Sequence, residues 1–253
     1  MPLETHWTLT SNFVGIPSLQ ANGAAGLTGA MMPDGVKGRL FIAPDPYGDK
    51  GNVMHSVLYE TDEYSGNGNR SEIANSASEY DEYWYSWWMM LGDDWGDLSM
   101  QCSLMQMHDS PDEGDGLKTP SFLLGTLSGH LRIIVPDTLP AENQIFIRRA
   151  SQRIIPKLWY HLCLHVNWKT SSSGFREVFV DGVPIWREFG IATNFTDVKA
   201  PFLKLGVYNG LSAPSGWVKR TAYYSDVRIW RGPATYEQGL NRELAIPIPL
   251  LSL

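Results

Sequence analysis

Three short segments, far apart in the chain, carry side chains that can hold an anion and move a proton. They are Asn69–Ile73, Gln106–His108 and Lys204–Tyr208. Within each segment the reactive side chains occupy alternating positions; these residues are Arg70, Glu72, Gln106, His108, Lys204 and Tyr208. Residues at this spacing share one face of a β-strand. If the three strands lie in one sheet, they form a surface suited to carboxylate binding and proton transfer, and poorly suited to nucleophilic or metal-hydride chemistry.

The elements that must position these residues have the sequence patterns of β-strands. Nine segments are rich in aromatic, β-branched or alternating apolar residues: 83–91, 100–108, 122–127, 131–135, 159–168, 177–180, 183–189, 202–208 and 221–230. Asp181-Gly182 separates two of them and favours a two-residue hairpin turn, because both residue types tolerate positive φ angles. No long segment has the period of an amphipathic helix. These patterns predict an all-β sandwich or jelly roll.

The length of 253 residues suits one large all-β domain. We prefer one domain, 1–253, over two small ones, because no change of composition marks a boundary. Residues 240–253 form a C-terminal tail that we predict to pack on this domain, with an edge strand as the alternative. The ten Trp residues together favour broad sheets and a sugar-sized groove, although for any single Trp a place in the core is the more common explanation.

Charge and cysteine content narrow the range of functions. The net charge of −7 disfavours nucleic acid as a partner. No stretch approaches the length of a transmembrane span, and residues 1–11 show no signal-peptide pattern. Cys102 and Cys163 lie in apolar, strand-like segments, which favours two buried free thiols over a disulfide and offers no metal-binding spacing.

The three segments resemble the signature strands of jelly-roll polysaccharide lyases. Arg70-Ser71-Glu72-Ile73, Gln106-Met107-His108 and Lys204-Leu205-Gly206-Val207-Tyr208 are similar to the Arg-(Thr/Ser)-Glu-Leu, Gln-(Ile/Val)-His and Lys-Ala-Gly-x-Tyr strings of alginate lyases. The heparin lyase I-like and glucuronan lyase-like groups carry related strings. The aromatic strand at 83–91 and the hairpin at 178–183 resemble the heparin lyase-like group. The resemblance covers residues 69–230 and implies a concanavalin-like β-jelly roll of two antiparallel sheets with a concave substrate groove.

Two departures from these patterns concern the substrate. Gly210 stands where alginate lyases carry a polar, Gln-like residue. Acidic residues at 109, 112, 113 and 115 follow the histidine, which argues against a highly sulfated polymer because like charges repel.

The resemblance implies cleavage of a uronic-acid-containing polysaccharide by β-elimination. Arg70 and Gln106 would bind the uronate carboxylate. His108 would be the base or a charge-neutralising partner, and Tyr208 the general acid or the base of a syn elimination. We expect Lys204 and Arg70 to lower the pKa of Tyr208. The predicted substrate-binding residues are Glu72, Asn69, Asn209, His55 and Trp87.

The expected partner is an acidic polysaccharide, with no nucleic acid and no membrane, and we expect a monomer. No cofactor is expected to be required. The heparin lyase-like resemblance implies a structural calcium ion, with Asp197 as the candidate ligand. It also implies action outside the cell, by a secreted or phage-borne enzyme. The aromatic strand and glycine-rich loops favour an open groove and therefore endo cleavage.

Two other classes remain open on the residues alone. A non-catalytic carbohydrate-binding module on the same scaffold would keep the aromatic groove without needing both His108 and Tyr208. A glycoside hydrolase would need two carboxylates across the scissile bond, for which Glu72 and Glu82 are available.

Overall fold

The computed structural model describes residues 4–9, 20–23, 40–62, 68–74, 79–95, 102–110, 112–113, 119–136, 139, 146–210, 216–236 and 239. Within these residues the regular structure consists of fifteen strands and one short 3-10 turn, η1 (Asp93–Trp95). No helix in the described residues is long and apolar enough to cross a membrane. The predicted C-terminal tail, 240–253, lies outside the described residues.

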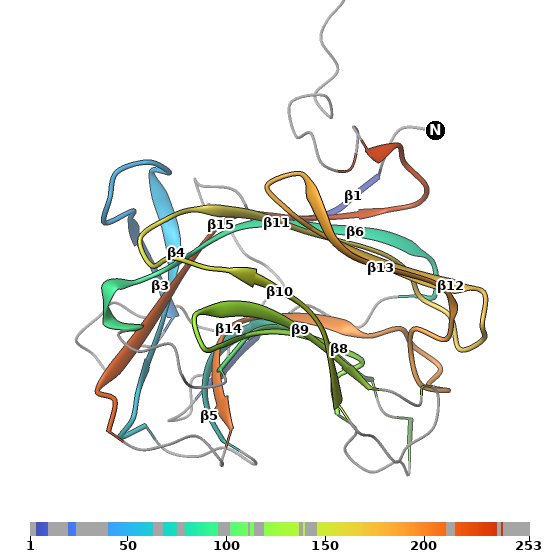
Figure 1. Ribbon diagram of the computed structural model, residues 1–253, viewed down its shortest axis with the longest axis horizontal. Helices are drawn as coiled ribbons and strands as arrows, with labels where there is room; N and C mark the ends of the chain where they lie inside the picture. Colours follow the sequence, from blue (N-terminus) through green and yellow to red (C-terminus); the bar gives the residue numbers. More distant parts are fainter. Residues whose placement is uncertain are drawn as a thin grey trace, which may run out of the picture.

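The strands form two antiparallel sheets that pack face to face (Figure 1). The eight-stranded sheet has the order β13 (Val183–Ile191), β12 (Gly174–Val180), β11 (Tyr160–Asn167), β6 (Glu82–Leu91), β15 (Lys219–Arg231), β4 (Asn52–Tyr59) and β3 (Leu40–Pro44), and β1 (Glu4–Leu9) also pairs with β15. The seven-stranded sheet has the order β10 (Phe146–Arg153), β9 (His130–Pro136), β8 (Phe122–Leu127), β7 (Cys102–His108), β14 (Phe202–Gly210), β5 (Gly68–Ala74) and β2 (Gln20–Gly23).

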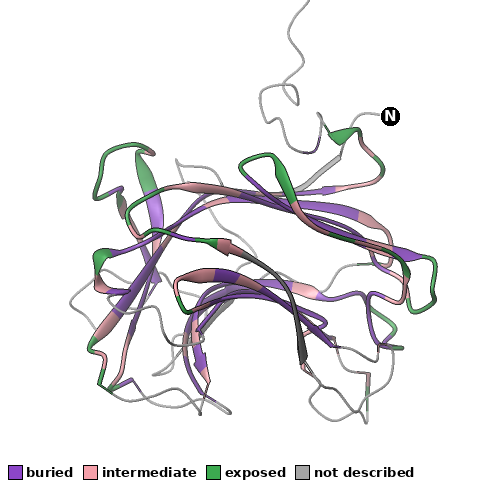
Figure 2. Ribbon diagram, in the orientation of Figure 1, coloured by how far each residue is buried: buried purple, intermediate pink, exposed green. Residues whose placement is uncertain are grey.

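The hydrophobic core lies between the two sheets, where the purple, buried stretches face each other in Figure 2. On β14, Leu203, Leu205 and Val207 belong to this core. Because side chains alternate along a strand, Lys204 and Tyr208 must point to the opposite, outer face of the seven-stranded sheet. Figure 1 shows this sheet bent into an arch whose hollow side faces away from the eight-stranded sheet.

The observed fold confirms the predicted jelly roll of two antiparallel sheets. Each of the nine predicted strands overlaps an observed strand, and β8 has the predicted bounds. The predicted hairpin joins β12 to β13, with positive φ angles of 50° at Asp181 and 79° at Gly182. Cys102 and Cys163 are free and buried, as predicted.

Candidate active site

The three segments with reactive side chains lie on three adjacent strands, β7, β14 and β5. Lys204 on the middle strand β14 faces Gln106 of β7, and Tyr208 faces Arg70 of β5. Directly opposed residues of an antiparallel pair point to the same face of the sheet. The expected convergence of these side chains on one surface is therefore confirmed for the strand positions, and the surface is the outer face of the seven-stranded sheet.

Arg70 and Tyr208 form the first contact of this cluster. The Arg70 guanidinium lies over the Tyr208 ring, 4.5 Å from its centroid, which is a cation–π arrangement. Burial raises the pKa of the Tyr208 hydroxyl above its ordinary value, although Arg70 acts in the opposite direction. The expected lowering of the Tyr208 pKa is therefore wrong, because desolvation of the phenolate outweighs the nearby cation. Tyr208 holds its proton at neutral pH, which suits a proton donor.

Glu72, Gln106 and Lys204 form the centre of the cluster and are almost completely buried. The Gln106 amide donates a hydrogen bond to the Glu72 carboxylate. Glu72 also lies 4.0 Å from the Arg70 guanidinium. Glu72 therefore orients two side chains that can bind a carboxylate, and itself occupies a position between them.

Lys204 carries a pKa below its usual value, chiefly because burial disfavours the ammonium form. Arg70 acts in the same direction, whereas Glu72 and Asp109 favour the charged form. These influences place Lys204 in electrostatic contact with both the Arg70–Glu72 pair and Asp109. A lysine in this setting gains stabilisation from any further anion that binds beside it.

His108 stands at the far end of the cluster and has a carboxylate partner. Its Nδ1 atom lies 2.8 Å from the Oδ1 atom of Asp109, whose side chain is fully buried. The ring also stacks on Phe202, with centroids 5.4 Å apart. The hydrogen bond of Nδ1 is to the backbone carbonyl oxygen of Asp109, 3.2 Å away. A proton held on Nδ1 by this bond leaves Nε2 as the nitrogen available to a substrate. Asp109 and Phe202 thus fix the ring orientation and its tautomer.

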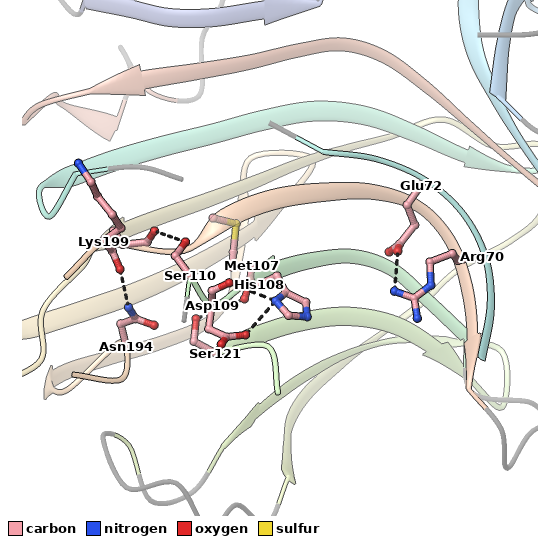
Figure 3. Close-up of polar contacts among 10 residues, drawn as sticks. Arg70, Glu72, Met107, His108, Asp109, Ser110, Ser121, Asn194 and Lys199 are labelled. Carbon is pink, nitrogen blue, oxygen red and sulfur yellow. Dashed lines mark hydrogen bonds and ion pairs between the residues drawn. The ribbon is translucent and has the colours of Figure 1, made fainter. Parts of the chain in front are cut away.

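His108 and Tyr208 do not contact each other. His108 lies at one end of the cluster, and Tyr208 lies with Arg70 at the other end. His108 faces Phe202 on β14, six residues before Tyr208, so their backbones are separated by about 20 Å along the strand. Figure 3 shows the Arg70–Glu72 pair and the His108–Asp109 pair at separate places on the sheet. The two candidate proton-transfer groups therefore lie at different ends of the cluster along β14 and β7.

Two predicted substrate-binding residues lie on the opposite face of the sheet. Asn69 faces Asn209 across β5 and β14, and both side chains are buried. Asn69 donates to the Tyr59 carbonyl, and Asn209 accepts a weak bond from the Cys102 thiol. The prediction for Asn69 and Asn209 is corrected, because each occupies a position of odd spacing from Arg70 or Tyr208 and so points inward.

Two further predicted residues lie on the other sheet. Trp87 of β6 is only 2% exposed and belongs to the core between the sheets. His55 of β4 packs between Phe41 and Tyr223 in the eight-stranded sheet. The structure does not bring Trp87 or His55 to the outer face of the seven-stranded sheet, so both are corrected as site residues.

The candidate calcium ligand Asp197 is buried in the segment that precedes β14. Calcium takes six to eight oxygen ligands, several of them from carboxylates. Asp197 is buried and its backbone carbonyl accepts a hydrogen bond from Tyr80. In the part of the chain that the structure describes, no group of three His, Cys, Asp or Glu side chains is arranged to hold a metal ion.

The sequence reasoning assigned no role in the site to Asp109, Phe202 or Gly206. Asp109 directly follows His108 in the sequence, and this adjacency is the signal that could have identified it as the partner of the imidazole ring. Gly206 faces Glu72, and a Cβ atom there would lie 2.0 Å from the Ser71 carbonyl oxygen. Its lack of a side chain keeps β5 and β14 close and leaves the space between Lys204 and Tyr208 free.

Comparison with known proteins agrees with this arrangement. The model of the polysaccharide lyase family matches residues 13–228, and the chain therefore belongs to the polysaccharide lyase family. No curated protein sequence matches the chain.

Solved structures of lyases share the fold at low sequence identity. The endo-β-1,4-glucuronan lyase from the fungus Trichoderma reesei is 15% identical, with a TM-score of 0.67, over 90% of this chain and 96% of that one. Alginate lyase A1-II', a member of polysaccharide lyase family 7, is 13% identical, with a TM-score of 0.59, over 85% of this chain and 96% of that one. Alginate lyase AlgAT5 of the same family is 10% identical, with a TM-score of 0.57, over 85% and 95% of the two chains.

Proposed function

We propose that this protein cleaves a uronic-acid-containing polysaccharide by β-elimination at internal positions of the polymer. The observation that carries the proposal is that the carboxylate-binding groups Arg70, Gln106 and Lys204 share one face of the sheet with His108 and Tyr208. The glucuronan and alginate lyases that share the fold are named for uronate polymers. Family membership supports elimination as the reaction class.

The elimination begins with the uronate carboxylate bound by Arg70, Gln106 and Lys204. A base removes the proton from C5, and the electron pair moves into the carboxylate, which becomes an enediolate. Positive and hydrogen-bonding groups on the carboxylate stabilise the added charge. The C4–O4 bond then breaks, a C4–C5 double bond forms, and the departing oxygen takes a proton.

His108 and Tyr208 divide the two proton transfers. Asp109 holds Nδ1 of His108, so Nε2 is the atom that takes the C5 proton. Tyr208 keeps its proton because burial raises its pKa, so it donates to O4.

The residues of the alternative hydrolase site are not suited to that reaction. Glu72 is bonded to Gln106 and lies beside Arg70, and Glu82 lies on the other sheet, with Oε1 2.9 Å from Nε2 of His165. A glycosidase needs two carboxylates across one bond, within about 5–10 Å of each other. Two carboxylates on different sheets of the sandwich do not form such a pair.

The proposal is tested by ultraviolet absorbance during incubation with alginate, polyglucuronate, hyaluronan, heparan and pectate. Each elimination creates a conjugated double bond, so we expect absorbance to rise on at least one uronate polymer. His108→Ala and Tyr208→Phe should each lower the rate by about two orders of magnitude or more. His55→Ala and Tyr47→Phe, which change residues outside the cluster, serve as matched controls. Binding without any absorbance change would instead identify a carbohydrate-binding module.

A further inference from the structure

A second arginine lies on the outer face of the seven-stranded sheet, away from the cluster. Strand β9 alternates between Leu131, Ile133 and Val135, which belong to the core, and residues of the opposite face. Arg132 is one of the latter. The outer face of this sheet therefore has arginines on two strands that are not neighbours, β5 and β9.

Arg132 is aligned with the Arg70–Tyr208 pair across the sheet. Tyr208 faces Ser103, Ser103 faces Gly125, and Gly125 faces Arg132. These residues form one transverse row, from Arg70 on β5 to Arg132 on β9. Three strand spacings of about 4.8 Å place Arg132 about 14 Å from Tyr208 along the sheet, which is further than one sugar ring reaches.

The two positions between Tyr208 and Arg132 carry almost no side chain. Ser103 has a single hydroxyl group, and Gly125 has none. A Cβ atom at Gly125 would lie 2.5 Å from the Cys102 carbonyl oxygen, so the backbone there excludes any larger residue. Because no large side chain rises from the sheet between Tyr208 and Arg132, a chain of sugar rings has room to lie across the strands.

Arg132 lacks an anionic partner of its own among the described residues. Its Nε atom is buried and has no hydrogen-bond partner there, and no ion pair joins its guanidinium to a carboxylate in those residues. Its nearest neighbours on the same face of β9 are His130 and Ile134, neither of which is an anion. A partly desolvated guanidinium without a partner is costly, and it is stabilised by a planar carboxylate that accepts two hydrogen bonds.

We propose that Arg132 binds the carboxylate of a second uronate residue, on the same polymer chain as the uronate at Tyr208. This inference rests on the proposed uronate substrate. A chain that crosses the strands from Arg70 to Arg132 is held at two separated carboxylates. The site therefore prefers long uronate chains over short ones, which is the behaviour of an enzyme that cuts within polymers.

The test measures binding, so that it does not depend on cleavage. In a Tyr208→Phe background, calorimetry gives the affinities of a trimer and a hexamer of glucuronate and of alginate. With Arg132 present, the hexamer should bind more tightly than the trimer. Arg132→Gln should reduce this gain about tenfold, and Arg132→Lys should restore part of it. Arg228→Gln, which removes a cation from β15 on the other sheet, is the matched control and should keep the gain.

The outcomes separate this inference from the proposed reaction. Retention of the full hexamer gain in Arg132→Gln would overturn it, even if the native protein cleaves the polymer. The absence of binding to every uronate oligomer would overturn it as well. Loss of the gain in a protein that never produces ultraviolet absorbance would support the Arg132 subsite and reject only the elimination. Thermal unfolding of each variant confirms that folded proteins are compared.

Discussion

Burial disfavours the positive charge of Lys204, which the proposed reaction uses to bind the uronate carboxylate. Its lowered pKa means that the ammonium is lost below the ordinary value of 10.5 as the pH rises. Tyr208, whose pKa is raised, keeps its proton until the pH exceeds 10.0. The two shifts act in opposite directions, because burial brings the loss of the Lys204 cation to lower pH and the loss of the Tyr208 proton to higher pH.

We predict that kcat/KM declines on the alkaline side with an apparent pKa that belongs to Lys204. Lys204→Arg should shift this decline to higher pH, because a guanidinium stays charged. Lys204→Met should remove the decline together with most of the activity. The pH profiles of kcat/KM for the three proteins check this, since they report ionisations of the free enzyme. An unchanged alkaline limb in Lys204→Arg would assign that ionisation to another group.

Asp109 should act through His108 and not on the substrate. In Asp109→Asn, the amide can present its NH₂ group to Nδ1, which favours the tautomer with a proton on Nε2 and blocks its use as a base. We expect kcat to fall about ten- to a hundredfold with little change in KM. Because the two residues act as one unit, Asp109→Asn should add little to the loss already caused by His108→Ala. Additive losses in the double variant would show that Asp109 acts independently.

At the scale of elements, the junction of β5 and β14 depends on Gly206. Its φ angle is 144°, which is disfavoured for residues with a side chain, and the register between β14 and β7 shifts between Leu205 and Tyr208. Because of this bulge, Tyr208 pairs with Ser103 while Lys204 pairs with Gln106, although four residues of β14 then match three residues of β7. The glycine therefore keeps the two ends of the candidate site in their relative positions.

We predict that Gly206→Ala destabilises the protein by about 2 kcal/mol or more, because the new methyl group meets backbone atoms of β5. Gly210→Ala on the same strand is the matched control, since a Cβ atom there meets nothing within 4 Å. It should cost less than about 1 kcal/mol. Denaturant unfolding monitored by Trp fluorescence gives both values. Equal stability of the two variants would contradict the role assigned to Gly206.

The sequence was informative where one strand face is polar and the other is apolar. The alternation in β14 and β7 correctly predicted that Lys204, Tyr208 and Gln106 share a face. It failed for β6, where both faces are aromatic: Tyr85 and Trp87 point to the core, and Trp84 packs on the other side with Phe179. With no polar face to mark solvent, the pattern could not distinguish a core Trp from a groove Trp.

Strand order and register were beyond the reach of local patterns. The neighbouring positions of β7, β14 and β5 depend on pairings between residues about 100 to 140 positions apart, so the sequence analysis could state their presence in one sheet only as a condition. The bulges in β7 and β14 are equally non-local. The shift between Ser103 and Met105 turns Ser103 to the outer face, which strict alternation from Gln106 would not do.

At the scale of the whole molecule, a protein with a net charge of −7 must bind a polyanion. At an ionic strength of 0.01 M the Debye length is about 30 Å. This exceeds the radius of gyration of about 18 Å expected for 253 residues, so the substrate feels the full net charge. At 0.15 M the Debye length is about 8 Å. The distant negative charges are then screened, whereas Arg70 and Lys204 still attract a carboxylate in contact with them.

We therefore predict that kcat/KM on a uronate polymer first rises with added salt and then falls. The rise reflects screening of the overall repulsion, and the fall reflects weakening of the contacts at Arg70 and Arg132. Initial rates at low polymer concentration, measured from 0.01 M to 1 M NaCl, check this. Arg132→Gln should make the decline of kcat/KM at high salt less steep, because this variant lacks one of the salt-sensitive contacts with the polymer. A rate that declines from the lowest salt onward would mean that the cations on the outer face dominate the field that the polymer meets.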